Sequence, residues 1–388
     1  NIGSGFVWLS TQLGITGSGF VVFTFIASTI ISMGTGAPIA AVFAVVPIFY
    51  PPGIMLGAKA AVLVGAILSG VFFGDAMSPS SQVINTTIDT QHDKQTHKPA
   101  DLQAVMKARS PYLVGVALLS AILFYMSGAT GAVINPAKLA IINQNADGKG
   151  LFMLIPIVIL LVISFIKKDL FLGLSYATVI GLILGVVLGN FQMRDILMTN
   201  RQHELLGILT TGTFSMTDII ISSILLFGMI AVAVESGCLD MLCEWILKKK
   251  VIQSPMGAEL VLVLSIGVIN ILLSGCVLPA ILLFSNVADQ IGQSANISPN
   301  KRSYLLTGVA TTVTAIIPVN SAFVMGAVTL INQIKVTGYG KVAVNPFEIF
   351  ASSYYCILLT LVCFLWVFKR EKQNNTEKVG IKGVSRNA

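Results

Sequence analysis

The segment SGVFFGDAMSPS, residues 69–80, is the most informative stretch of this chain. Asp75 stands near the end of an apolar run that starts near Ala60. A carboxylate at membrane depth costs about 3 kcal/mol or more, so it is rarely retained there without a role. The glycines before Asp75 and the Ser-Pro pair after it are residues that interrupt a helix and free backbone carbonyls. The segment therefore predicts a broken membrane helix that holds a small cation at its break.

The overall composition is that of a polytopic membrane protein. Of the 388 residues, 55% are hydrophobic and 11% are charged, whereas soluble domains carry about 25% charged residues. The net charge is +7, but the basic residues fall in short loops and in the tail, which indicates membrane topology rather than nucleic-acid binding. The five cysteines form no CxxC pair and the three histidines lie in polar loops. We therefore expect no disulfide, no metal centre of the zinc type and no cofactor.

Two parts of the chain show the same order of apolar runs and interruptions, shifted by about 240 residues. We expect a first repeat over residues 1–130, with a hairpin at 20–49, a broken helix at 60–88 and a helix at 110–127. We expect a second repeat over 131–368, with scaffold helices at 151–248, a hairpin at 258–292, a broken helix at 303–331 and a helix at 347–368. Interrupted segments in corresponding positions of two halves are the best sequence pointer to the binding site of a transporter.

The distribution of basic residues orients this architecture. If 20–49 and 258–292 are re-entrant hairpins, most of the 24 Lys and Arg residues share one side of the membrane. The segments on this side, predicted to be cytoplasmic, are 90–109, 167–169, 248–250, 295–302 and the disordered tail 369–388. The two repeats are then inverted. By this symmetry about three N-terminal helices are absent from the first repeat, so we expect the natural protein to be longer at its N-terminus.

Oxygen-bearing side chains follow Asp75, namely Ser78, Ser81 and Asn85. If the helix resumes at Pro79, Ser78 is a natural N-cap, and Ser81 and Asn85 share one helix face. Oxygen ligands suit a hard cation such as Na⁺, and a proton competes for the same carboxylate. We therefore expect Asp75 to bind Na⁺ or H⁺, with these three residues beside it.

The second interruption and the two hairpin tips offer neutral groups. The stretch from Ile317 to Phe323 has no acid, but it contains a proline break, Pro318, and the polar residues Asn320 and Ser321. Helix N-termini at the hairpin tips favour an anionic group such as a carboxylate. The tip residues expected to face the same cavity are Gly34, Thr35, Gly36, Ser274, Gly275 and Cys276.

The motif Gly74-Asp-Ala-Met-Ser-Pro79, together with Asn85, resembles the GDKMSPxSDTTN segment of the NhaC-type Na⁺/H⁺ antiporter family. Two further stretches, Ser32–Gly36 and Ile317–Ser321, resemble the SxGTSWGT and PWN segments of that family, so the resemblance spans about residues 20–368. It implies a bacterial or archaeal inner-membrane carrier of the ion transporter superfamily, with hairpin-bearing inverted repeats and elevator motion. By analogy with elevator carriers, it also implies a homodimer.

The chain departs from the family pattern at several positions. Ala76 replaces the lysine of the motif, Gln82 its second acid, and Val83-Ile84 its pair of threonines. The upstream SWGT part is reduced to Gly36-Ala-Pro38. Asp75 is left as the one acid of the motif. Relatives in the family carry amino acids or organic acids, for example in malate–lactate exchange.

We therefore expect a secondary active transporter, in the first place a Na⁺/H⁺ antiporter in which Asp75 binds Na⁺ and H⁺ alternately. The alternative is a Na⁺- or H⁺-coupled carrier or exchanger of an amino acid or small carboxylate. A channel needs a continuous polar pore, whereas this sequence has isolated polar interruptions. No HExxH, GxSxG or nucleotide-binding motif points to an enzyme or an ATP-driven pump.

Overall fold

The computed structural model describes residues 17–129, 148–167, 170–199, 205–215, 250–318, 321–334 and 342–369, with scattered single positions between them. These residues are mainly helical. The strands are a short antiparallel pair, β1 (Met198–Thr199) and β2 (Leu205–Leu206). The expected all-α fold class is confirmed.

Five helices in the described part are long and apolar enough to cross a membrane: α2 (Ser18–Thr35), α3 (Pro38–Met55), α4 (Ala60–Met77), α6 (Leu102–Ser127) and α14 (Pro255–Leu272). Two further helices, α18 (Pro346–Ser352) and α19 (Tyr354–Phe368), pass the same test as one span bent by 59°. A helix of 18 residues is about 27 Å long, close to the hydrocarbon thickness of about 30 Å.

The outer surface of these helices is apolar. On α6 the side chains of Leu118, Ile122 and Met126 are 64%, 58% and 77% exposed. Such a surface suits lipid rather than water. Together with the spans, it makes the chain a multi-pass membrane protein.

The first half contains a helical hairpin followed by a broken helix. α2 ends at Gly36, whose φ of 60° lies in the left-handed region, and α3 starts with Pro38 in its first turn. Both arms have 18 residues and are longer than the apolar runs from which the hairpin 20–49 is predicted. Its re-entrant character stays a prediction. After α4 the chain is irregular until α5 (Gln82–Thr90).

The second half has the same order of elements. α14 and α15 (Val277–Ser294) form a hairpin whose turn contains Ser274 and Gly275, both with positive φ. α16 (Pro299–Ile316) follows, and after an interruption the chain continues as α17 (Ala322–Gln333). The predicted final helix 347–368 is instead the bent pair α18 and α19.

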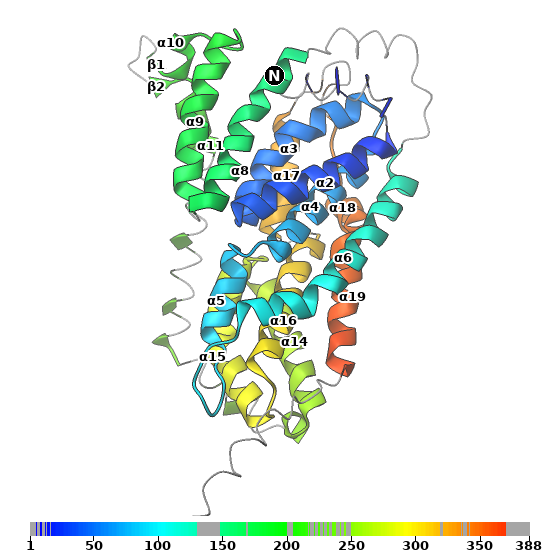
Figure 1. The fold of residues 1–388 in the computed structure, drawn as a ribbon, viewed down its shortest axis with the longest axis vertical. Coiled ribbons are helices and arrows are strands. Elements are labelled where there is room, and N and C mark those ends of the chain that lie inside the picture. Colours follow the sequence, from blue (N-terminus) through cyan, green and yellow to red (C-terminus); the bar gives the residue numbers. More distant parts are fainter. Residues whose placement is uncertain are drawn as a thin grey trace, which may run out of the picture.

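Segments from the two halves lie side by side in the core. α3 packs against α17, α5 against α15, and α6 against α19 (Figure 1). The broken helices also meet, because the rings of Phe72 and Phe323 have centroids 4.8 Å apart. Figure 1 shows the α2–α3 hairpin in the upper part of the molecule and the α14–α15 hairpin in the lower part.

The remaining described elements flank this core. They are η1 (Gly148–Leu154), α8 (Ile155–Lys167), α9 (Leu170–Val187), α10 (Met193–Ile196), α11 (Ile208–Ser215) and η2 (Lys250–Gln253). Figure 1 shows α8 to α11 in green, with α8 packed beside α2. Most of the predicted scaffold segment after residue 215, and the predicted tail after Lys369, lie outside the described residues.

Three basic residues that the sequence places in cytoplasmic loops are buried in helices. Arg109 belongs to α6 and is 3% exposed, while Lys301 and Arg302 belong to the first turn of α16 and are 3% and 1% exposed. Lys301 pairs with Glu259 at 2.6 Å and Arg302 with Asp289 at 2.7 Å. These partners belong to other helices, α14 and α15, which is why charge alone indicated loops. The side of the membrane on which the three residues lie stays a prediction.

Candidate functional site

The centre of the candidate site is the end of α4. Asp75 lies in its last turn and is 1% exposed, and the helix ends at Met77. Neither carboxylate oxygen accepts a hydrogen bond from any residue that the structure describes. A buried carboxylate normally has several hydrogen-bonding partners, because an unpartnered buried charge is costly. Its isolation therefore makes Asp75 the first candidate for a binding position in this part of the chain.

Two groups act on the Asp75 carboxylate without bonding to it. The Ser81 hydroxyl lies nearby but does not reach the geometry of a normal hydrogen bond with the carboxylate, and the Arg109 guanidinium attracts it electrostatically. Arg109 donates hydrogen bonds to the backbone carbonyl of Ala76 and, over 3.2 Å, to the hydroxyl of Thr307 on α16. The positively charged guanidinium of Arg109, on α6, is thus fixed beside the end of α4.

The chain after Asp75 is arranged differently from the expectation. Ser78 does not cap a helix that resumes at Pro79. It ends α4, and its hydroxyl donates to the carbonyl of Met33 on α2 over 2.8 Å. Helix α5 begins at Gln82, with Ser81 as N-cap accepting from the amide of Ile84. The Ser78 hydroxyl prefers the hairpin because the last carbonyls of α2 lack helical partners.

Asn85 binds the irregular segment between α4 and α5 from the side of α5. Its side-chain amide donates to the carbonyl of Pro79 over 3.2 Å, and its backbone amide donates to the carbonyl of Ser81. The predicted residues Ser78, Ser81 and Asn85 are therefore brought together around the irregular segment. They hold its backbone in place.

The tip of the first hairpin is fixed to this break. Ser32 donates to the carbonyl of Val71 on α4 over 2.6 Å. A Cβ atom on Gly36 would lie 2.8 Å from the carbonyl oxygen of Ser80, so only glycine fits both this contact and the positive φ. Gly34 is buried within α2, and the Thr35 hydroxyl donates back to the carbonyl of Ser32. The tip thus touches the break, but it directs no side-chain oxygen at the Asp75 carboxylate in the described contacts.

The tip of the second hairpin is fixed to the second break in a similar way. The Ser274 carbonyl accepts from the amide of Ala322 over 3.0 Å, and the Gly275 carbonyl accepts from the hydroxyl of Thr314 over 3.1 Å. Ser321 is the N-cap of α17 and is 1% exposed. Cys276, the N-cap of α15, bonds through its amide to the carbonyl of Leu273.

The described residues of the second break differ from those of the first in containing no unpartnered charged side chain. Thr314, at the end of α16, donates its hydroxyl proton within the protein and accepts from the Asn270 amide over 2.8 Å. Pro318 is half-buried, and Asn320 lies outside the described residues. Of the two breaks, the first therefore holds the charged group.

One functional candidate that the sequence did not reveal is Tyr355, at the start of α19. It is completely buried, and its hydroxyl has no hydrogen-bonding partner in the described part of the chain. It interacts electrostatically with Arg109 and Asp75, and its ring packs on Phe73 with centroids 5.3 Å apart. Tyr355 stands within an apolar run, where a tyrosine usually indicates no more than packing. The role of Arg109 was also not recognised from the sequence. Its position two residues before Pro111, at the start of a long apolar run, could have indicated that it belongs to the following helix.

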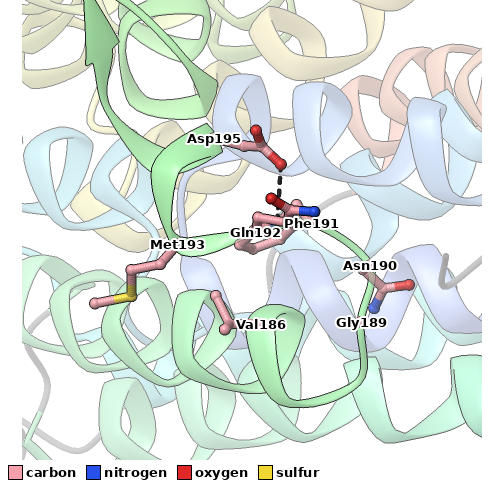
Figure 2. Close-up of a pocket in the computed structure, with 7 residues that line it drawn as sticks. All are labelled: Val186, Gly189, Asn190, Phe191, Gln192, Met193 and Asp195. Carbon is pink, nitrogen blue, oxygen red and sulfur yellow. Dashed lines mark hydrogen bonds between the residues drawn. The ribbon is translucent and has the colours of Figure 1, made fainter.

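A surface cavity of about 600 Å³ lies elsewhere, at the turn between α9 and α10. Figure 2 shows its lining residues, which are Val186, Gly189, Asn190, Phe191, Gln192, Met193 and Asp195. It contains none of the predicted site residues. The one carboxylate in its lining, that of Asp195, accepts a hydrogen bond of 2.8 Å from the backbone amide of Gln192 and so stabilises the turn.

The described residues contain no cluster of three or more His, Cys, Asp or Glu side chains of the kind that holds a transition metal. The oxygen-bearing group that the structure shows near the Asp75 carboxylate is instead the hydroxyl of Ser81. Such oxygen atoms are the usual ligands of alkali and alkaline-earth cations.

Comparison with known proteins finds one informative similarity. The chain is 29% identical over 180 residues to the "Malate-2H(+)/Na(+)-lactate antiporter" of Bacillus subtilis (strain 168). The match covers 46% of this chain and 37% of that protein, so the chain spans well under half of the relative's length. No protein-family model matches the chain, and neither does any solved structure. The similarity supports a membrane transporter, while membership of the NhaC-type family stays a prediction.

Proposed function

We propose that this chain is part of a secondary active antiporter that binds Na⁺ and H⁺ alternately at Asp75. The observation that carries the proposal is a fully buried carboxylate with two unpartnered oxygens at the end of a broken helix. Na⁺ and H⁺ are monovalent cations, so either one balances the single negative charge of the carboxylate. Because both neutralise the same charge, they exclude each other, which is the minimal requirement for exchange.

The proposed transport mechanism uses two inverted repeats that move a common site across the membrane. Support comes from equivalent contacts about 240 residues apart. Ser32 bonds to the carbonyl of Val71 in the first half, and Asn270 bonds to the carbonyl of Ala310 in the second. The helices α4 and α16 have 18 residues each, and the next helix begins after an N-cap serine, Ser81 or Ser321. Elevator motion, a bacterial inner membrane and a cytoplasmic C-terminus belong to the same proposal.

A second candidate function is the coupled exchange of a small carboxylate. It is favoured by the printed name of the similar protein, which is an antiporter of malate with protons and lactate with Na⁺. The two candidates share the cation site at Asp75. They differ in whether the exchange of Na⁺ and H⁺ needs an organic anion.

Transport by purified protein in lipid vesicles separates the candidates. We expect an imposed Na⁺ gradient to drive a pH change inside vesicles that contain the wild type, and Asp75→Asn to abolish it. Asp89→Asn is the matched control, because Asp89 is an exposed acid on the adjoining helix α5. A pH change that appears only after malate or lactate is added would favour the second candidate. A pH change that survives in Asp75→Asn would contradict both.

A further inference from the structure

The side chain of Arg109 is a buried cation with an unusual set of contacts. It is 3% exposed on α6, and two of its guanidinium nitrogens donate to the Ala76 carbonyl and to the Thr307 hydroxyl. The third nitrogen, Nε, is buried without a partner among the described residues. Arg109 thus joins the end of α4 to α16 and α6, and the carbonyl that it holds belongs to the residue after Asp75.

Arg109 and Asp75 attract each other without forming an ion pair. Each is among the charged or polar groups that act on the other, but no contact within 4.0 Å joins the two side chains. Of the groups that act on the carboxylate in the described part, Arg109 is the charged one. Charges separated by several ångströms in a protein interior interact strongly, because water does not screen them.

We propose that Arg109 is the resident counter-charge of Asp75 and that it sets the affinity of the site for Na⁺. This inference rests on the proposed function, in which the cation binds at Asp75. Arg109 is a positioning residue in this role, since it acts on the ion through electrostatics and through the Ala76 carbonyl rather than by contact. Its charge makes the empty carboxylate tolerable in the interior and opposes the arrival of a second positive charge.

The role fits the needs of a carrier. A transporter must release its ion as well as bind it, so an isolated buried carboxylate would hold Na⁺ too tightly. A fixed guanidinium that does not reach the carboxylate lowers the affinity and leaves the oxygen atoms accessible. It also fixes the position of the Ala76 carbonyl at the end of α4.

The test is the Na⁺ dependence of thermal stability of the purified full chain, measured for five proteins. They are the wild type, Asp75→Asn, Arg109→Gln, Arg109→Lys and Thr307→Val. Arg109→Gln keeps hydrogen-bond donors but removes the charge, and we expect its apparent Na⁺ affinity to rise about tenfold. Arg109→Lys keeps the charge and is expected to restore an affinity near that of the wild type. Thr307→Val removes only a hydrogen-bonding partner of Arg109 and is expected to leave the affinity unchanged.

A purely structural role for Arg109 predicts the opposite result. Loss of a structural contact leaves Na⁺ affinity unchanged or lowers it, so an Arg109→Gln affinity within twofold of the wild type, or weaker, overturns the inference. If Arg109→Gln does not fold, Asp75→Asn with Arg109→Gln provides the answer. Recovery of a folded protein in the double variant supports Arg109 as the counter-charge of Asp75. Failure of both variants to fold overturns the inference.

The outcomes distinguish this inference from the function on which it rests. If Na⁺ stabilises the wild type and not Asp75→Asn, but Arg109→Gln has wild-type affinity, the proposed cation site stands and the role of Arg109 falls. If Na⁺ does not stabilise the wild type at all, both are overturned.

Discussion

The contact between α2 and α4 predicts a specific sensitivity at Gly74, the residue before Asp75. A Cβ atom at this position would lie 2.9 Å from the amide nitrogen of Met33 and closer still to the carbonyl oxygen of Thr29. Ordinary Cβ contacts start at 3.4 Å, so Gly74→Ala requires α2 to move by at least about 0.5 Å. The neighbouring atoms belong to the helix backbone and cannot rotate away.

The expected cost follows from this geometry. Overpacking a close helix contact costs about 1–3 kcal/mol, because the helices must separate along their length. The displacement also pulls the Met33 carbonyl away from the Ser78 hydroxyl, which now lie 2.8 Å apart. We therefore expect Gly74→Ala to lower both the thermal stability and the rate of Na⁺-driven pH change.

The matched control is Gly115→Ala on α6, where an added Cβ meets no atom within 4 Å. Because alanine favours helix more than glycine, this change is expected to be neutral or stabilising by up to about 1 kcal/mol. Melting curves of both variants in detergent, and transport in vesicles, provide the comparison. Equal stability and transport for Gly74→Ala and Gly115→Ala would show that the close contact between α2 and α4 at Gly74 is not limiting.

Three further predictions follow from the described contacts. Glu259→Gln removes the negative charge paired with the buried ammonium of Lys301, which keeps its hydrogen bond to the Lys369 carbonyl. We therefore expect a loss of about 3–5 kcal/mol, seen as a lower melting temperature than in Glu259→Gln with Lys301→Met. Ser321→Ala removes the N-cap of α17 and is expected to cost about 1 kcal/mol, whereas an unchanged melting temperature would count against the cap. In the loop after α5, amide hydrogen bonds from Thr96 and Gln95 hold the pKa of Asp93 below its ordinary value. These hydrogen bonds should therefore hold the loop fully at a pH above the ordinary pKa of Asp93. They should weaken as the pH falls through the lowered pKa. Hydrogen exchange of residues 91–101 would show this, and Asp93→Asn should lose the pH dependence.

Much of the fold was readable from the sequence because the deciding signals are local. Apolar runs, glycine turns and the Ser-Pro interruption report on helices and breaks within a few residues. The same signals located Asp75, since an acid in an apolar run needs no long-range information to be noticed. Helix ends were less accurate, because capping by Ser81 rather than Ser78 depends on a contact with the first hairpin.

The parts that were missed depend on contacts between distant segments. Arg109 bonds to Thr307, and Lys301 pairs with Glu259, so each charge is neutralised or bonded by a residue that local patterns do not indicate. Interpretation of short stretches of sequence assigns such charged residues to loops. Tyr355 was missed for the related reason that its unpartnered hydroxyl is a property of three-dimensional packing and not of residue type.

The proposed function depends on one carboxylate, that of Asp75, which binds Na⁺ in exchange for H⁺. The most direct measurement is the release of protons when Na⁺ is added to purified protein in weak buffer, together with the amount of radioactive Na⁺ that is bound. We predict the release of up to about one proton per bound Na⁺ in the wild type and in Asp89→Asn, and neither binding nor release in Asp75→Asn. Na⁺ binding of wild-type affinity in Asp75→Asn would contradict it.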